Sequence, residues 1–204
     1  DISSSAFFIV LTLLSKKSNL IIKKVNINKT RLGIVKILNK MNAKIKFFNK
    51  RIYNGEEISD IYIKSANNLK SINCPANLNS SAIDEFLVIF LVAARAKGIS
   101  TFKKLNELNK KESPRLDISI NFLKMIGIKV LKHNDNIKIY GNPNLDLKGN
   151  YYVKNFFKDH RVFMMSCIAA LVFGGNWKIY DRDSINTSFP KFLTILKTLG
   201  ARIF

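Results

Sequence analysis

Three stretches of the chain are apolar on every side and carry polar or charged residues mainly at their start. They are SSSAFFIVLTLL (residues 3–14), IDEFLVIFLVAARA (residues 83–96) and DHRVFMMSCIAALVF (residues 159–173). A helix that lacks a polar face is normally buried, and these stretches are shorter than the roughly 20 residues that span a membrane. The pattern therefore predicts three buried helices and no transmembrane segment.

Each apolar helix is followed by a short strand, an amphipathic helix and another strand. The amphipathic helices are predicted over Thr30–Met41, Glu112–Ile126 and Thr187–Leu199. Their candidate N-caps are Thr30, Ser113 and Thr187, with Pro114 and Pro190 early in the last two helices. Asn42, Gly127 or Gly200 comes next, and Asn or Gly fits the left-handed position just past a helix. The last such turn predicts a strand that runs to Phe204.

The chain is therefore predicted to consist of three repeats, approximately residues 1–66, 79–141 and 158–204. The first two repeats add a further strand, Glu57–Ser65 and Asp135–Gly141, and the Asn-, Pro- and Gly-rich gaps Asn68–Asn79 and Asn142–Phe157 are predicted to be loops. Three all-apolar helices avoid water by packing together inside, which gives an α/β (α+β) fold with the strands and amphipathic helices outside.

The charged residues cluster at predicted helix starts, where unsatisfied N–H groups and the helix dipole favour anions. At the apolar helices these residues are Ser3–Ser5, Ser80–Glu85 and Asp159–Arg161. At the amphipathic helices they are Arg31, Lys111–Arg115 and Thr187–Ser188. If the repeats share one orientation, these ends meet and form an anion site.

Three of these helix starts carry residues suited to chemistry. Lys111 and Arg115 share a helix face and suit a phosphate or carboxylate, and Glu112 beside them is able to exchange protons. Asp84 and Glu85 are either a carboxylate pair aimed at a cleft or simple capping residues. The same alternative holds for Asp159, His160 and Arg161, and a solvated helix start is the alternative for Lys111–Arg115.

Composition adds a formal charge of +20 but no metal or redox signature. The charge indicates either binding of nucleic acid or anionic substrates, or an A/T-rich codon bias. The lysines are scattered and aromatic residues do not interleave with them, which favours the codon bias. Nucleic acid is therefore not the expected partner. Cys74 and Cys167 are far apart and are expected to be buried apolar residues, and with only His133 and His160 besides them neither a metal nor a cofactor is expected. No targeting segment is visible, which predicts a cytoplasmic protein.

Six ordered segments resemble the signature segments of the 5-enolpyruvylshikimate-3-phosphate synthase family. They are DISSSAFFIV, NKTRLG, IDEFLVIFLVAARAKG, NELNKKESPRL, KDHRVFMMSCIAAL and TSFPKFLTILKTLGA. The resemblance covers nearly the whole chain and implies the C-terminal domain (residues 1–204) of a two-domain enzyme, with an inverse barrel of three repeats around inner helices. Since the chain starts with Asp1 rather than Met, we expect a fragment that lacks the N-terminal domain and the leading segment of this domain.

The resemblance also implies a reaction and a set of site residues. The family transfers the enolpyruvyl group of phosphoenolpyruvate to the 5-hydroxyl of shikimate-3-phosphate and releases phosphate. It implies Asp84 and Glu112 as catalytic residues, Asp84 and Lys111 at shikimate-3-phosphate, and Arg115 and Arg161 at phosphoenolpyruvate. Further candidates are Asp159, His160, Thr187 and Arg31.

Two positions depart from the family pattern, because Asn109 stands where the family usually has Arg and Pro114 where it usually has Asp. Loss of the arginine puts in doubt an ion pair that supports the site. The two departures together leave a decayed copy of the enzyme as an alternative. A UDP-sugar enolpyruvyl transferase and a basic nucleic-acid-binding module of related fold are two further alternatives.

Overall fold

The computed structural model describes all 204 residues, which divide into two compact units, Asp1–Leu145 and Asp146–Phe204. The predicted repeats 1–66 and 79–141 lie in the first unit, and the repeat 158–204 lies in the second. We describe each unit by itself. That the three repeats form one globular domain stays a prediction.

The first unit contains the same arrangement twice. The first copy comprises α1 (Ile2–Leu14), β1 (Asn19–Asn26), α2 (Gly33–Lys40), β2 (Ile45–Tyr53) and β3 (Glu56–Lys64). The second comprises α4 (Phe86–Arg95), β4 (Gly98–Phe102), α5 (Arg115–Met125), β5 (Val130–His133) and β6 (Asn136–Gly141). In both antiparallel sheets the third strand lies in the middle, in the orders β1-β3-β2 and β4-β6-β5. The predicted repeat and its additional strand are therefore confirmed in this unit.

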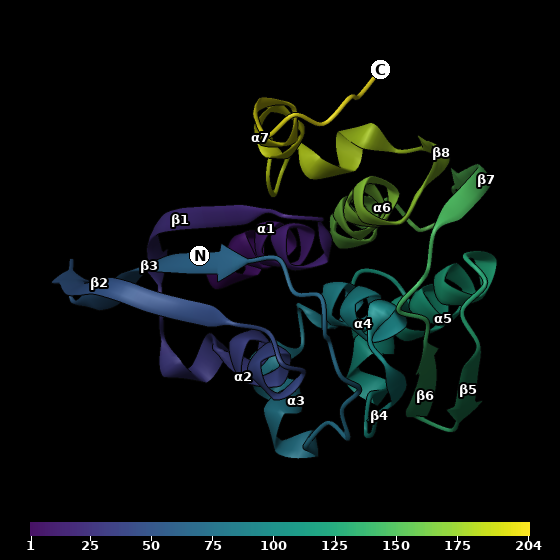
Figure 1. The fold of residues 1–204 in the computed structure, drawn as a ribbon, viewed down its shortest axis with the longest axis horizontal. Coiled ribbons are helices and arrows are strands. Elements are labelled where there is room, and N and C mark those ends of the chain that lie inside the picture. Colours follow the sequence, from purple (N-terminus) through teal and green to yellow (C-terminus); the bar gives the residue numbers. More distant parts are fainter. The chain divides into compact units, whose positions relative to one another are not determined.

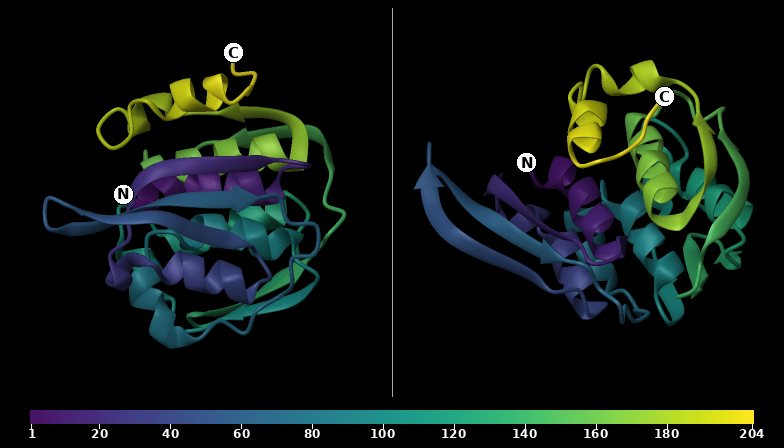
Figure 2. Two further views of the ribbon diagram at one scale, coloured as in Figure 1. Left: turned by 60° about the vertical axis from the view of Figure 1, so that its left-hand side comes forward. Right: turned by 45° about the horizontal axis from the view of Figure 1, so that its top comes forward.

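Helices α1 and α4 form the inside of the first unit, as their apolar sequences predict. They lie side by side (Figure 1), and each also contacts the sheet of its own repeat. All residues of α4 from Phe86 to Ala94 are buried, and in α1 even Thr12 is buried, its hydroxyl donating to the carbonyl of Phe8. Outside this core the β2–β3 hairpin extends beyond the helices (Figure 2), with Ile52 and Tyr53 exposed near its tip.

The amphipathic helices begin later than predicted. Residues Lys29–Arg31 form a 3₁₀ turn (η1), where Asn28 accepts from the amide of Thr30, so α2 starts only at Gly33. A Cβ at Gly33 would lie 2.5 Å from the backbone carbon of Ser81, so only glycine lets α2 approach this closely. Helix α5 starts after Pro114, because proline disfavours helical backbone at the preceding residue, Ser113.

The second apolar helix is broken rather than continuous. A short helix α3 (Asn79–Ala82) ends before α4 begins at Phe86, and Glu85 is the N-cap residue of α4. The break coincides with Asp84 and Glu85, whose carboxylates bind side chains from other elements rather than the helix itself. Asp84 therefore lies in a turn that aims it away from the helix axis.

A buried carboxylate closes two bulges in the first sheet. Asp60, on the central strand β3, accepts from the backbone N–H of Lys24 at 2.8 Å and from the side-chain amide of Asn49 at 3.1 Å. Lys24 and Asn49 both have positive φ and lie where the registers of β1 and β2 shift. The hydrogen bond from Lys24, and then that from Asn49, lowers the pKa of Asp60 from its ordinary value of 3.8.

We expect Asp60→Asn to lower the melting temperature at pH 7, because the uncharged amide binds the two bulges more weakly. A lowered folded pKa stabilises the protein above the unfolded value, and this contribution is lost as pH falls from about 4 through the folded pKa. The difference from wild type should therefore shrink progressively as the pH falls below about 4. Thermal unfolding from pH 2 to 8 checks this, with Glu57→Gln on the same strand as control; equal melting temperatures at pH 7 would contradict it.

The second unit comprises β7 (Leu147–Val153), α6 (His160–Phe173), β8 (Gly174–Ile179) and α7 (Phe192–Thr198). Helix α6 is buried along most of its length, as predicted, and Gly174 ends it with a φ of 84°. Strand β7 pairs parallel to β8, and Tyr151 stacks on Trp177. The loop prediction for 142–157 was therefore wrong at β7, where Gly149 and Asn150 break the alternation and the register shifts.

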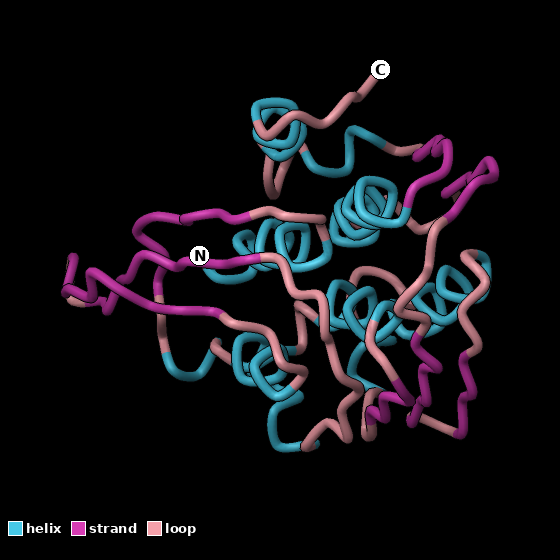
Figure 3. Tube along the Cα trace, in the orientation of Figure 1, coloured by secondary structure: helices cyan, strands magenta, loops and turns pink.

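Two further predictions for the second unit were wrong. Helix α7 begins at Phe192 rather than Thr187, because Pro190 disfavours helical backbone at Phe189. Residues 201–204 form no strand and are drawn as loop in Figure 3. In the first two repeats the corresponding strands, β2 and β5, pair with the strand that follows them. Residues 201–204 pair with no strand, and the backbone N–H of Ala201 instead donates to the carbonyl of Leu196 at 3.0 Å.

Candidate functional site

Three cations converge on the carboxylate of Asp84 in the first unit. Its Oδ1 lies 3.4 Å from Nζ of Lys111 and 3.5 Å from Nη1 of Arg115, and its Oδ2 lies 3.6 Å from Nη2 of Arg31. The cations come from the turn η1, from the residue after η3 (Asn106–Lys110) and from the first turn of α5. Separate segments thus build one cluster around a carboxylate whose side chain is 22% exposed.

Arg115 is the buried centre of this cluster, with a side-chain exposure of 0%. Its second terminal nitrogen donates to Glu112, three residues earlier and before α5 begins, so one guanidinium links both predicted catalytic carboxylates. A buried charge is tolerated only when it is paired and hydrogen-bonded. Glu112 remains 56% exposed and is therefore open to solvent or a ligand on its other side.

Asn109 organises the start of α5, which has no side-chain cap of its own. Its Oδ1 accepts from the amides of Leu116 at 2.9 Å and Asp117 at 3.3 Å, and its Nδ2 donates to the carboxylate of Asp117 at 2.9 Å. Asn109, which departs from the family pattern, therefore caps α5 although it lies six residues before the first residue of this helix. The sequence pattern does not indicate this capping role.

A second contact pair in this region joins residues that are distant in the sequence. The hydroxyl of Ser3 donates to the carboxylate of Glu85, and Arg31 donates to the same hydroxyl at 3.0 Å. Ser3 was predicted only as part of a helix start, and Glu85 as a capping residue or as a carboxylate aimed at a cleft. No sequence signal indicates that residues 82 positions apart would bind each other.

The second unit gathers the other candidates at the start of α6. Asp159 is the N-cap, as predicted; it is 1% exposed and accepts from the amide of Arg161 at 2.9 Å. His160 and Arg161 are half-buried in the first turn, whereas Thr187 is exposed in the segment before α7. The structure thus assembles Asp84, Lys111, Glu112, Arg115 and Arg31 in one unit and Asp159, His160 and Arg161 in the other. That the two groups form one site stays a prediction.

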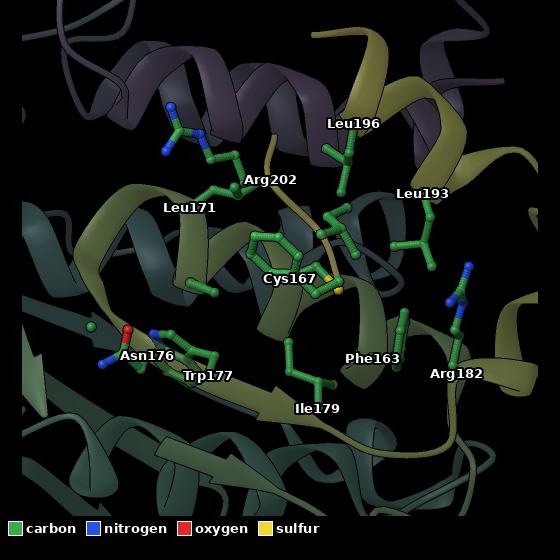
Figure 4. A pocket seen from close by; sticks show the side chains of 14 residues that line it. Phe163, Cys167, Leu171, Asn176, Trp177, Ile179, Arg182, Leu193, Leu196 and Arg202 are labelled. Carbon is green, nitrogen blue, oxygen red and sulfur yellow. The ribbon is translucent and has the colours of Figure 1, made fainter. Parts of the chain in front are cut away.

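A cavity of about 480 Å³ lies within the second unit (Figure 4). Its lining is mainly apolar, with Phe163 and Cys167 of α6, Trp177 and Ile179 of β8 and Leu196 of α7, and it contains no carboxylate. Burial raises the pKa of the Cys167 thiol to about 12 and that of Cys74 to about 11, so both thiols stay protonated near neutral pH. This cavity therefore lacks a group suited to acid–base chemistry.

Two classes of site find no support in the structure. No three His, Cys, Asp or Glu side chains lie together in a way that would hold a metal ion. No helix is both long and apolar enough to cross a membrane. The Asp84 cluster brings three cations and two carboxylates together within reach of solvent.

Comparisons with known proteins agree on one family. Residues 1–196 match the family model of EPSP synthase (3-phosphoshikimate 1-carboxyvinyltransferase). The chain is 36% identical over 199 residues to the 3-phosphoshikimate 1-carboxyvinyltransferase of Thermodesulfovibrio yellowstonii and 38% identical over 203 residues to that of Zymomonas mobilis. Each match covers 98% of this chain but 45% of the relative, so the chain spans about half the length of these relatives.

Solved structures give the same result for the fold. An EPSP synthase from Acinetobacter baumannii matches 97% of this chain and 45% of its own chain, with a TM-score of 0.90 and 34% identity. The enolpyruvyl transferase NikO from Streptomyces tendae matches 99% of this chain and 43% of its own, with a TM-score of 0.74 at 15% identity, which indicates a shared fold alone. The predicted enolpyruvyl transferase-like α+β fold class is confirmed.

Proposed function

Because the chain belongs to the EPSP synthase (3-phosphoshikimate 1-carboxyvinyltransferase) family, we propose that it supplies the acid–base half of an enolpyruvyl transferase. The reaction joins the enolpyruvyl group of phosphoenolpyruvate to the 5-hydroxyl of shikimate-3-phosphate and releases phosphate. The observation that carries the proposal is the Asp84 carboxylate held by Lys111, Arg115 and Arg31, with Glu112 on the same guanidinium.

The chemistry requires, among cations, one group that accepts a proton and one that first donates and then accepts a proton. The 5-hydroxyl loses its proton to Asp84 as its oxygen adds to C2 of phosphoenolpyruvate, while the methylene carbon gains a proton from protonated Glu112. The C2–O bond to phosphate then breaks, phosphate leaves with the proton that Asp84 had taken, and Glu112 takes its own proton back as the double bond re-forms. Cations stabilise the charge of both phosphorylated substrates, and carboxylates transfer the protons.

Substrate binding would change the partners of the cluster. Together with the nearby Glu85, three carboxylates face three cations, so the ligand-free site is charge-balanced. We infer that the phosphate of shikimate-3-phosphate binds Lys111. Phosphoenolpyruvate then replaces Glu112 as the partner of the buried guanidinium of Arg115. Both exchanges would leave Asp84 and Glu112 with fewer cationic partners.

Arg161 is proposed to hold phosphoenolpyruvate from the first turn of α6. We expect Arg161→Ala to raise the KM for phosphoenolpyruvate about 10- to 100-fold, as for loss of a charge-assisted hydrogen bond, with a smaller change in kcat. Steady-state kinetics in the gene product at its natural length check this. Lys158→Gln removes a charge from an exposed neighbour that pairs with Asp183, and serves as control; an unchanged KM in Arg161→Ala would remove Arg161 from the site.

The 204 residues alone are expected to show no turnover. The relatives are about twice as long, and we propose that the part that this chain does not span, the N-terminal domain of the same enzyme, supplies further substrate ligands. Phosphate release from phosphoenolpyruvate and shikimate-3-phosphate is measured for the isolated chain and for the gene product that contains it. Turnover by the isolated chain would refute this expectation.

A further inference from the structure

We propose that Ser3, Arg31 and Glu85 are positioning residues that fix the orientation and charge of Asp84. This inference rests on the proposed function only where Asp84 acts as a base. The family resemblance assigns no role in the reaction to Glu85 or Ser3, and yet both lie beside the cluster and are almost completely buried, with exposures of 2% and 6%.

The contacts form one continuous chain of side chains. The carboxylate of Glu85 accepts from the Ser3 hydroxyl at 2.5 Å, and that hydroxyl accepts from Nη2 of Arg31 at 3.0 Å. The same Nη2 lies 3.6 Å from Oδ2 of Asp84. Three segments meet here, namely the first turn of α1, the turn η1 and the residues just before α4.

The direction of the hydrogen bonds follows from the groups involved. Glu85 in its ionised form only accepts and Arg31 only donates. The Ser3 hydroxyl therefore gives its one proton to Glu85 and turns its lone pairs to Arg31. A buried carboxylate needs such compensation, and the chain links its charge to the guanidinium of Arg31. This link fixes an arginine whose side chain is 53% exposed and would otherwise be held weakly.

The two carboxylate oxygens of Asp84 have different cationic partners. Lys111 and Arg115 approach Oδ1, whereas Arg31 approaches Oδ2. When substrate anions occupy Lys111 and Arg115, Oδ1 becomes available to the substrate hydroxyl. Arg31 then remains as the cation that keeps the carboxylate ionised and prevents its rotation.

The charged groups around Asp84 are therefore Arg31 from η1, Lys111 after η3, Glu112 and Arg115 at the start of α5, and Glu85 before α4. Loss of Arg31 removes a cation within about 4 Å, which favours the protonated form of Asp84 by roughly one pH unit or more. Ser3→Ala changes no charge, so any shift it causes reports the position of Arg31.

The first test is the pH profile of kcat/KM in the gene product at its natural length. Arg31→Gln is expected to lower kcat about tenfold at pH 7 and to move the acidic limb up by about one pH unit. Ser3→Ala should move it in the same direction by less, and Arg31→Lys should restore part of the loss. Lys29→Gln removes the same charge from the same turn and should leave the profile unchanged. A wild-type profile in Arg31→Gln, whatever its melting temperature, would overturn the proposal.

The second test does not depend on turnover. NMR titration of the Asp84 carboxyl carbon, without substrates, should give a higher midpoint in Ser3→Ala and Arg31→Gln than in wild type. Adding Ser3→Ala to Arg31→Gln should cause no further shift, because the link is already broken. Equal midpoints in wild type and Ser3→Ala would overturn the link. If the wild-type protein has no transferase activity, the proposed function fails, and these midpoints alone decide whether the link exists.

Discussion

Asp84→Asn is expected to lower kcat for enolpyruvyl transfer about a thousandfold, with much smaller changes in the KM of either substrate. General-base catalysis typically contributes 10²- to 10⁴-fold, and the asparagine side chain keeps the size of the aspartate but cannot take the proton of the hydroxyl. It also removes the negative charge that Lys111, Arg115 and Arg31 surround. Steady-state phosphate release in the gene product at its natural length gives kcat and both KM values.

The control for this experiment is Asp183→Asn, which neutralises an exposed carboxylate that pairs with Lys158 in the second unit. Asp183→Asn should leave kcat within a factor of two of the wild-type value, because ion pairs on the surface contribute little to stability. Circular dichroism of both variants establishes that they are folded. A kcat for Asp84→Asn within tenfold of wild type would contradict its role as the base.

Arg115→Met is expected to reduce both stability and activity. The free energy of unfolding should fall by about 3 kcal/mol, because this change removes a fully buried cation and leaves the mostly buried carboxylate of Asp84 with one partner fewer. The side chain is fully buried and holds Glu112 as well as Asp84, so turnover should also be lost. Arg115→Lys keeps the charge but not the two-pronged contact, and an intermediate loss is expected for it.

Urea denaturation of wild type and both variants measures the change in stability. Arg51→Met removes an exposed arginine of β2, whose side chain donates only to the backbone of Asn49, and controls for the loss of one positive charge. If Arg115→Met is as stable as Arg51→Met, then Arg115 is not the structural centre of the cluster.

The sequence predicted the elements whose pattern is local. Helix α6 was predicted from its all-apolar run, and its N-cap Asp159 from the charged residues before it. Lys111, Glu112 and Arg115 were predicted as a group because they lie within one turn. Asp84 was assigned to the same site through the family resemblance, and the structure places it in contact with Lys111 and Arg115.

The features that the sequence did not predict depend on distant partners. Strand β7 exists because β8 pairs with it, although Gly149 and Asn150 break its own pattern. Residues 201–204 have the alternation of a strand but no neighbour to pair with. Asn109 caps α5 across a turn, and Ser3 reaches Glu85 from the other repeat. Such contacts are fixed by tertiary structure and leave no local pattern.

The most direct test of the account is the identity of the reaction product. The gene product at its natural length is incubated with phosphoenolpyruvate and shikimate-3-phosphate, and the mixture is analysed by phosphorus NMR and mass spectrometry. The account predicts equal amounts of inorganic phosphate and of the enolpyruvyl ether at the 5-hydroxyl, formed only when both substrates are present. Transfer to a UDP-sugar instead, or no product at all from a folded protein, would contradict it.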